Sequence, residues 1–429
     1  MSSTVADERV APQSASLETT VVTSWKAPVV FGIFTLVALA LAVFAPRPGE
    51  TTYRLSLPGD VIQLPELTVP AMPALWTVVV LLAAATAYSA WLVSSKRRVP
   101  LWLVVVFAIL FMFGFLTWAG SGASLPMIGL LFGSLSLAVP LIFGSLAGVI
   151  GERAGVVNIA IEGQLLAGAF TAAVVASVTR QPFLGLVAAM VAGMLVGMVL
   201  AAFAIKYFVD QVIVGVVLNV LVIGLTSFFY SQVLAPNAAV LNTPPRFDRL
   251  PIPVLSEIPI IGPVLFRQTI VVYLMYIAVA LVYFGLFHTK WGLRVRAVGE
   301  HPQAADTVGI NVNRTRFWNV ALAGAIAGLG GTFFTIGSGI AFNKEMTAGA
   351  GFIALAAVIF GQWDPIKATL AALLFGFASN LQNTLSVIGS PVPSEFMLML
   401  PYVVTIFAVA GFVGKSRAPA ADGKPYIKS

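Results

Sequence analysis

The sequence predicts an all-α, polytopic membrane bundle of about 10–12 transmembrane helices with one discontinuous helix region. Three observations support this prediction. Of the 429 residues, 59% are apolar and only 10% are charged, whereas soluble domains have about 25% charged residues. The apolar residues gather in runs of about 20, the length that spans a bilayer as a helix. These runs are apolar on every face, unlike the alternating strands of a membrane β-barrel.

The apolar runs predict twelve membrane segments in order along the chain. The first is an uncleaved span, because its run ends at Pro46 and the preceding residues are too long and too mixed in charge for a signal peptide. The segment at 348–362 is short and either crosses or re-enters. The segments lie at about 28–45, 74–94, 100–119, 127–149, 156–178, 183–206, 211–234, 269–288, 316–337, 348–362, 366–388 and 396–413.

Charge distribution predicts that both termini are cytoplasmic. In that orientation 17 of the 24 Lys and Arg residues lie on the cytoplasmic side, as the positive-inside rule expects. The predicted parts are a disordered tail at 1–27, extra N-terminal spans at 28–119 with an external loop at 46–73, a core at 120–414 with an external loop at 235–268 and a cytoplasmic loop at 288–316, and a cytoplasmic tail at 415–429.

Composition excludes several kinds of site. The chain has no cysteine, and its two histidines, His288 and His301, lie in one loop without metal-site spacing. We therefore expect no metal and no cofactor. The segment Gly414 to Ser416 resembles the end of a phosphate-binding loop, but Val409 stands where that motif needs glycine. The net charge of +7 belongs to loops facing the cytoplasm, so no nucleic-acid partner is expected.

A polar segment at 151–163 interrupts two apolar helices with glycines, an asparagine and two carboxylates. A charge at membrane depth costs at least about 2.5–3.5 kcal/mol, and irregular backbone there must be buried in protein or line a wet cavity. Asn158 and Glu162 are therefore candidates for a substrate path. The alternative is a cytoplasmic turn in which Glu162 occupies a first helical turn, where the helix dipole favours it.

Three further asparagines lie in apolar surroundings. Asn219 falls inside a run of valines and leucines, where it bonds either a neighbouring helix or a ligand. Asn380 and Asn383 share one face of the segment at 366–388. That polar face indicates either a wet path or helix packing, and all three residues are candidates for the path.

Two loops hold candidate docking elements. The external loop at 235–268 is rich in proline and carries charged residues; it either docks an external protein or is a solvated connector. In the cytoplasmic loop, Pro302 suits a first helical position and Gly309 suits the residue after a helix end. A two-turn helix with Ala304, Ala305 and Val308 apolar fits between them. It is a docking element or, alternatively, part of a solvated linker.

Three stretches resemble the permease subunits of bacterial ABC importers for branched-chain amino acids, ribose-type sugars and nucleosides. The segment 155–163 is similar to the family's broken helix near the substrate path, and 292–331 is similar to its coupling loop and following helix. The third stretch, 351–376, is similar to a further stretch of the family, around Gly361, Pro365 and Gly376. The resemblance covers about 127–413 and leaves out the spans at 28–94. The segment from Glu152 to Gly163 is most similar to the nucleoside (basic-membrane-protein-associated) subtype.

The resemblance implies a transport subunit of the bacterial plasma membrane with no catalytic residues. A second permease subunit, often a different protein, would complete the path. A separate cytoplasmic ABC ATPase would hydrolyse ATP, and an external substrate-binding lipoprotein would deliver the substrate. The residues implied in ATPase coupling are Glu300, Pro302, Ala304, Ala305, Val308 and Gly309.

Two alternatives remain open. An ABC permease for simple sugars or branched-chain amino acids fits the same family. An ion-coupled secondary transporter fits the span count and the interrupted helix. The latter class needs titratable residues within the membrane, and Glu162 is the only candidate in the predicted spans.

Overall fold

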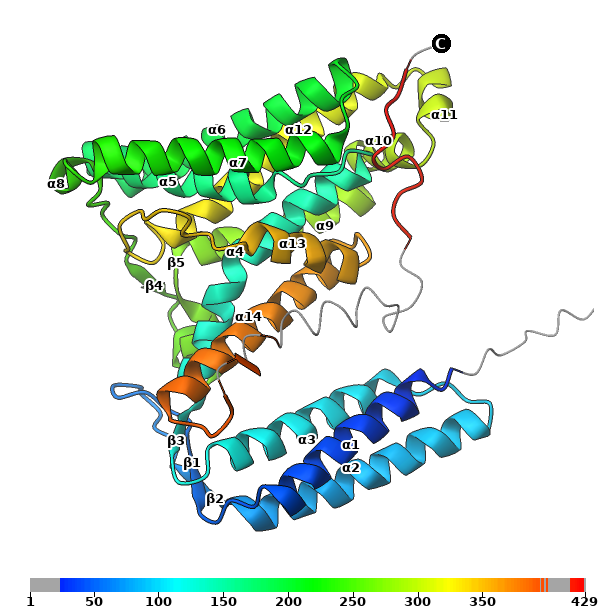
Figure 1. The fold of residues 1–429 in the computed structure, drawn as a ribbon, viewed down its shortest axis with the longest axis vertical. Helices are drawn as coiled ribbons and strands as arrows, with labels where there is room; N and C mark the ends of the chain where they lie inside the picture. The colour runs from blue at the N-terminus through cyan, green and yellow to red at the C-terminus, as the bar shows by residue number, and fades with distance from the viewer. Residues whose placement is uncertain (1–23, 394, 397–398, 400–416, 428–429) are drawn as a thin grey trace, which may run out of the picture. The chain divides into compact units, whose positions relative to one another are not determined.

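The computed structural model describes residues 24–393, 395–396, 399 and 417–427. Within these residues, nine helices are long and apolar enough to cross a membrane, which confirms the predicted all-α membrane bundle (Figure 1). The chain divides into two compact units. Among the described residues, one unit is built from 24–50 and Val69–Ser121, and the other from Thr51–Thr68 and the described residues from Gly122 onward.

The first unit is a three-helix bundle of α1 (Lys26–Phe44), α2 (Ala71–Ser94) and α3 (Leu101–Ala119). The ring of Phe31 stacks on that of Phe107 with 4.0 Å between centroids. After α1, Arg47 donates a hydrogen bond of 2.7 Å to the carbonyl oxygen of Ala119 at the end of α3. A cation is favourable there because the helix dipole is negative at its C-terminus.

The helices described from Gly122 onward lie in the second unit. Its helices are α4 (Met127–Arg153), α5 (Ile161–Thr179), α6 (Pro182–Ala201), α7 (Gln211–Phe229), α8 (Ala238–Leu241), α9 (Ile270–His288), α10 (Lys290–Glu300), α11 (Pro302–Thr307), α12 (Val312–Gly331), α13 (Ala350–Phe360) and α14 (Pro365–Val387). Shorter turns of π or 3-10 helix are η1 (Ala202–Lys206), η2 (Tyr230–Leu234), η3 (Leu255–Glu257), η4 (Gly262–Phe266) and η5 (Thr332–Phe334).

Short strands lie in the loops. They are β1 (Glu50–Arg54), β2 (Leu67–Pro70), β3 (Ser124–Pro126), β4 (Arg249–Pro251) and β5 (Arg267–Thr269). β1 pairs in parallel with β3, with Thr52 opposite Ser124. β4 pairs antiparallel with β5, which sets Arg249 opposite Thr269. This second pair closes the long segment between η2 and α9.

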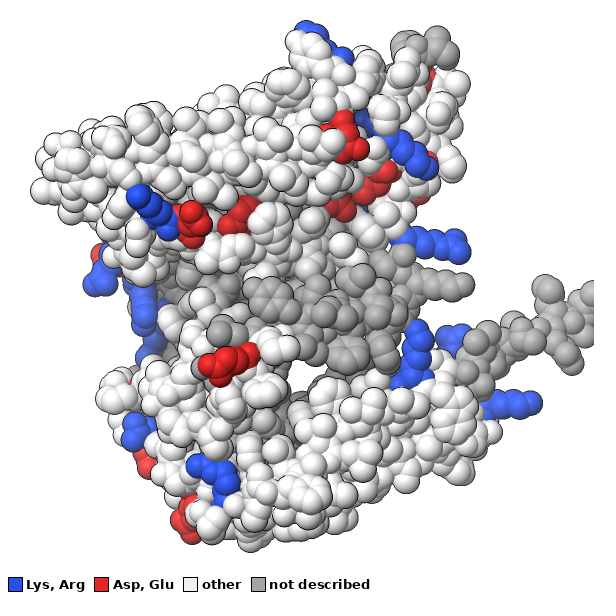
Figure 2. Space-filling model, in the orientation of Figure 1, with Lys and Arg blue, Asp and Glu red and all other residues white. Residues whose placement is uncertain are grey.

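Glycines let α6 and α12 approach closely, with α5 beside them (Figure 1). A Cβ atom on Gly324 would overlap the carbonyl oxygen of Gly193, and one on Gly328 would overlap that of Ala189. Small residues at such positions allow membrane helices to pack backbone against backbone. The backbones of α12 and α6 therefore lie in direct contact. The sequence of α7 contains no Lys, Arg, Asp or Glu, so the surface of this helix is uncharged along its length (Figure 2).

The structure describes two of the three late segments as helices. The short segment predicted at 348–362 forms α13, whose 11 residues rise only about 16 Å, too little for a hydrocarbon core of about 30 Å. α14 has 23 residues but is not among the nine apolar spans, since Asn380, Gln382 and Asn383 lie in its second half. The span predicted at 396–413 falls almost entirely outside the described residues.

Candidate functional site

The predicted interruption is the non-helical stretch 154–160 between α4 and α5. Asn158 is fully buried in it. Its side-chain amide donates to Gln164 Oε1 at 3.1 Å and accepts from Gln164 Nε2 at 3.2 Å. Because buried amides need partners, this reciprocal pair fixes the stretch against the first turns of α5.

Asn219 connects α7 to the same stretch. Its Oδ1 accepts from the backbone N–H of Gly163 at 2.8 Å, and its Nδ2 donates to the carbonyl oxygen of Ile159 at 2.8 Å. The asparagine is 3% exposed. Both halves of the amide are therefore used within the chain, and α7 is held against the start of α5.

Glu162 lies in the first turn of α5 and reaches the start of α13. Its Oε1 accepts from Thr347 Oγ1 at 2.6 Å and from Gly349 N at 2.9 Å, and its Oε2 accepts from Gly351 N at 2.6 Å. A carboxylate at a helix N-terminus meets free N–H groups and the positive end of the dipole. The buried carboxylate thus joins the N-terminal ends of two helices.

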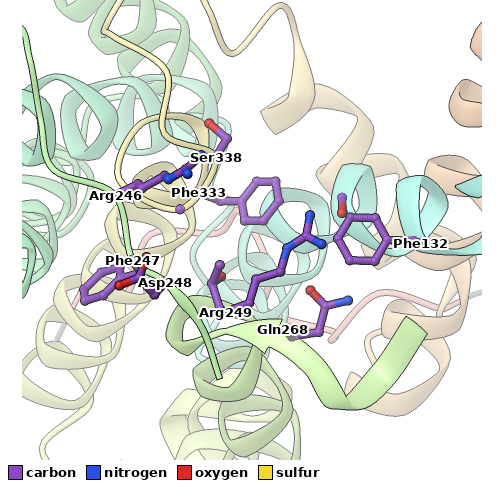
Figure 3. A pocket seen from close by; sticks show the side chains of 11 residues that line it. Phe132, Arg246, Phe247, Asp248, Arg249, Gln268, Phe333 and Ser338 are labelled. Carbon is purple, nitrogen blue, oxygen red and sulfur yellow. The ribbon is translucent and has the colours of Figure 1, made fainter. Parts of the chain in front are cut away.

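A cavity of about 540 Å³ lies between α4, η5 and the β4–β5 pair (Figure 3). Arg249 reaches into it from β4, with its guanidinium 4.6 Å from the ring centroid of Phe132 on α4. Phe333 faces the same space (Figure 3). The lining residues are Phe132, Ser136, Arg246, Phe247, Asp248, Arg249, Gln268, Thr269, Phe333, Gly337 and Ser338.

A second cavity of about 450 Å³ continues from the first. The two share Ser136, Phe333 and Ser338 in their linings. The second cavity extends to Thr347, whose hydroxyl is bonded to Glu162, and to Ser379 on α14. The volumes are in the range of small-molecule sites. The pair of cavities therefore leads from the β4–β5 pair to the start of α13, which Glu162 holds.

The lining of the first cavity combines aromatic rings with polar groups. Phe132 and Phe333 present aromatic rings to the cavity, with the Arg249 guanidinium over one face of Phe132, and Arg249, Asp248 and Gln268 add polar groups. Such a lining suits a polar molecule that contains an aromatic ring. Among the described residues, no group of three His, Cys, Asp or Glu side chains is placed to hold a metal ion.

The remaining path candidates lie apart from the interruption. Asn380 on α14 donates to the carbonyl oxygen of Leu130 on α4 at 2.7 Å, a helix-to-helix bond. Asn383 is exposed on the surface of the described chain. The structure therefore brings Asn158, Glu162 and Asn219 together and places Asn380 and Asn383 elsewhere, on the helix that also supplies Ser379 to the second cavity.

The helix predicted between Pro302 and Gly309 is confirmed as α11, with Pro302 in its first turn. Gly309 has φ of +84°, a conformation that favours glycine after a helix end. The three apolar side chains do not share one face. Ala305 is buried, whereas Ala304 and Val308 are exposed, Val308 by 75%. Ala304 and Val308 are therefore the members of the set that lie on the surface of the described chain.

Sequence reasoning missed the residues of the first cavity. Phe132, Arg249, Gln268 and Phe333 come from four different segments, and no spacing along the chain connects them. A partial signal was present in the external loop, where Arg246, Asp248 and Arg249 concentrate charge in a chain that has little of it.

The matching family model and two relatives of this chain are all described as permeases. The family model described as branched-chain amino acid transport system / permease component matches residues 130–409. The guanosine ABC transporter permease protein NupQ of Bacillus subtilis is 43% identical over 308 residues, covering 69% of this chain and 95% of that protein. The nucleoside ABC transporter permease protein NupC of Lactococcus lactis is 40% identical over 314 residues, with the same coverage.

A more distant match carries a different name. The putative glucose ABC transporter permease protein TsgC13 of Haloferax volcanii is 36% identical over 258 residues, covering 59% of this chain and 77% of that protein. No solved structure matches the chain significantly.

Proposed function

Because the chain belongs to the branched-chain amino acid transport system permease family, we propose that it is the transmembrane permease subunit of an ATP-driven importer of nucleosides. It is a transport component and not an enzyme. The observation that carries the substrate class is the identity of 43% and 40% to permeases named for guanosine and nucleosides, over 95% of their length. The family match at 130–409 includes the helices that build both cavities.

The first cavity is proposed to receive the nucleoside. Phe132 and Phe333 stack on the base, a contact worth about 1–3 kcal/mol per base in other proteins. Arg249 and Gln268 bond the polar edge of the base, and Ser136 and Ser338 bond the ribose hydroxyls. The shared lining of the two cavities supports passage of the substrate toward α13.

The predicted path residues are proposed to shape this route. Glu162 acts through Thr347, which lines the second cavity and donates to the carboxylate. Asn158 and Asn219 keep the interruption and α7 in register with α5. Asn380 and Asn383 are proposed to act from α14, next to Ser379 of the second cavity.

The chain is a multi-pass membrane protein that works within an ABC system with ATPase and substrate-binding partners. We propose that the ATPase is cytoplasmic and docks on α11 and its flanks, from Glu300 to Gly309, so that both termini face the cytoplasm of a bacterial plasma membrane. A second permease subunit completes the path, and an external lipoprotein delivers the substrate. ATP drives import because it binds one state of the assembly more tightly than the other.

A sugar substrate is the second candidate, since the match to TsgC13 favours it. The two are separated by uptake measurements on the complete complex, purified from native membranes with its partners and placed in liposomes with ATP on the ATPase side. We expect saturable uptake of labelled guanosine or uridine that excess glucose does not inhibit. Glucose uptake that nucleosides fail to inhibit would show that the substrate is a sugar. Uptake without ATP, driven by a proton or sodium gradient, would contradict both.

A further inference from the structure

The segment 417–427, here called the C-terminal strap, lies against the helices proposed to meet the ATPase (Figure 1). The backbone N–H of Ala421 donates to the carbonyl oxygen of Gly299 on α10 at 2.9 Å. The N–H of Ala420 donates to Glu300 Oε2 at 3.2 Å. The strap lies beyond the family match, which ends at residue 409, so nothing in that match assigns it a role.

An apolar cluster connects the strap to α11. Tyr426, 7% exposed, packs in one group with Val298 of α10, Ala305 of α11 and Val312 of α12. Ala305 is the member of the predicted apolar set that faces inward. The inner face of α11 is therefore covered partly by the strap, while Ala304 and Val308 stay exposed.

Arg316 connects the strap to the interruption between α4 and α5. This arginine of α12 is 1% exposed. Its Nη1 donates to the carbonyl oxygen of Lys424 at 2.7 Å, and its Nη2 donates to that of Ala421 at 3.4 Å. The same Nη2 lies close to Gly155, where a Cβ atom would be 2.6 Å from it. Gly155 has φ of +88°, so both backbone shape and space require glycine there.

Charged groups from three elements meet at the same place. The carboxyl groups of Glu152 on α4 and Asp422 on the strap lie near each other, and Arg316 lies near Asp422. Glu152 Oε2 also accepts from the indole N–H of Trp363. The described residues leave Glu152 Oε1, Asp422 Oδ1 and Arg316 Nε without hydrogen-bond partners, so packing and the hydrogen bonds to the strap's backbone hold this junction.

We propose that the C-terminal strap is a positioning element. It transmits movement of α10 and α11, through Arg316, to the interruption at 154–160 between α4 and α5. The connection runs from Ala305 to Tyr426, along the strap to Arg316, and from there to Gly155. The interruption in turn holds Asn158, three residues beyond Gly155. α10 also touches α4 directly, because Gly299 packs on the carbonyl of Arg153. The strap therefore reinforces the existing contact between α10 and α4 and couples that contact to the position of α11.

The proposal rests on the proposed function, because it needs an ATPase on α11 and a substrate that is moved. The test uses the complete complex in liposomes and measures three quantities for each variant: the amount of ATPase bound, the rate of ATP hydrolysis, and nucleoside taken up per ATP hydrolysed. The variants are a stop codon after residue 416, Tyr426→Ala and Arg316→Lys. The control is Ile427→Ala, whose side chain is 71% exposed.

With the strap deleted, we expect ATPase binding and hydrolysis within twofold of wild type and uptake per ATP reduced at least fivefold. Tyr426→Ala should also reduce uptake per ATP while leaving ATPase binding and hydrolysis within twofold of wild type, but by a smaller factor than the deletion. If the deletion lowers the amount of complex, Tyr426→Ala alone tests the proposal. Arg316→Lys retains a cation that can still reach one strap carbonyl, so it should recover part of the uptake per ATP that deletion loses.

Unchanged uptake per ATP in the deletion and in Tyr426→Ala would overturn the proposal. Loss of the bound ATPase in both would also overturn it, because the strap would then be part of the docking surface. Failure of the proposed function is a different result: the wild-type complex itself would bind no ATPase or move no nucleoside.

Discussion

Glu162 Oε2 accepts a hydrogen bond of 2.6 Å from the backbone N–H of Gly351, a residue 189 positions further along the chain. The same carboxylate bonds Thr347 and Gly349, so one side chain of α5 collects three donors at the start of α13. A helix of 11 residues is too short to be stable by itself. Its position is therefore set by packing on α4 and α14 and by this carboxylate.

Replacement of Glu162 by Gln should loosen α13. The amide nitrogen cannot accept from Gly351 or Gly349, and an unsatisfied buried donor costs about 1–3 kcal/mol. We expect a lower melting temperature of the purified chain and uptake reduced at least tenfold, with expression less affected than uptake. Thr347→Val, which removes one donor, is the matched partial variant. Equal loss of expression and uptake would show that the carboxylate serves folding alone.

Replacement of Phe132 or Phe333 by Ala should weaken nucleoside uptake through the Michaelis constant. Loss of one stacking face, at about 1–3 kcal/mol, corresponds to an increase of about 5- to 150-fold. Phe132→Tyr should retain most of the affinity. Phe228→Ala, on an exposed position of α7, is the control. A change in the maximal rate with the Michaelis constant unchanged would contradict a substrate contact at these rings.

Replacement of Val308 by Asp should release the ATPase without unfolding the chain. Val308 is exposed, so a charge there costs little in the isolated subunit but is buried unpaired when a partner docks. We expect the ATPase to be lost from the purified complex while the permease elutes as a single species. Ala304→Asp should act in the same way. Ala305→Asp should instead destabilise the chain, because Ala305 packs against Tyr426.

The strap should be released as the pH rises. Burial raises the pKa of Asp422 to about 7, an effect that the Gly423 N–H and Arg316 partly oppose. The docked strap therefore binds a proton that the free strap has lost above its ordinary pKa near 3.8. Its docking is strongest at acid pH and weakens as the pH rises through about 7.

Hydrogen exchange at Ala421, whose N–H is bonded to Gly299, measures this release. After correction for the intrinsic rate, exchange should be several-fold faster at pH 8 than at pH 6. Glu152 and Arg316 are the charged groups that face Asp422 from α4 and α12. Asp422→Asn should remove most of the difference between the two pH values. A corrected rate that is equal at both pH values in the wild-type chain would contradict the prediction.

Local signals predicted local structure well. α11 follows from Pro302 and Gly309 because helix caps depend on a few adjacent residues. The inward turn of Ala305 did not follow, since its partner Tyr426 is about 120 positions away. For the same reason the first cavity was missed: Phe132, Arg249 and Phe333 meet only when the bundle is assembled.

The Glu162 carboxylate between α5 and α13 also balances the partial positive charges at the N-terminal ends of these two helices. Each helix N-terminus carries about half a positive elementary charge, so the two together compensate one negative side chain. Glu162 and the ends of its two helices form a nearly neutral group where an isolated ion would be costly. A transported molecule without net charge, as most nucleosides are, therefore meets a compensated charge at Glu162.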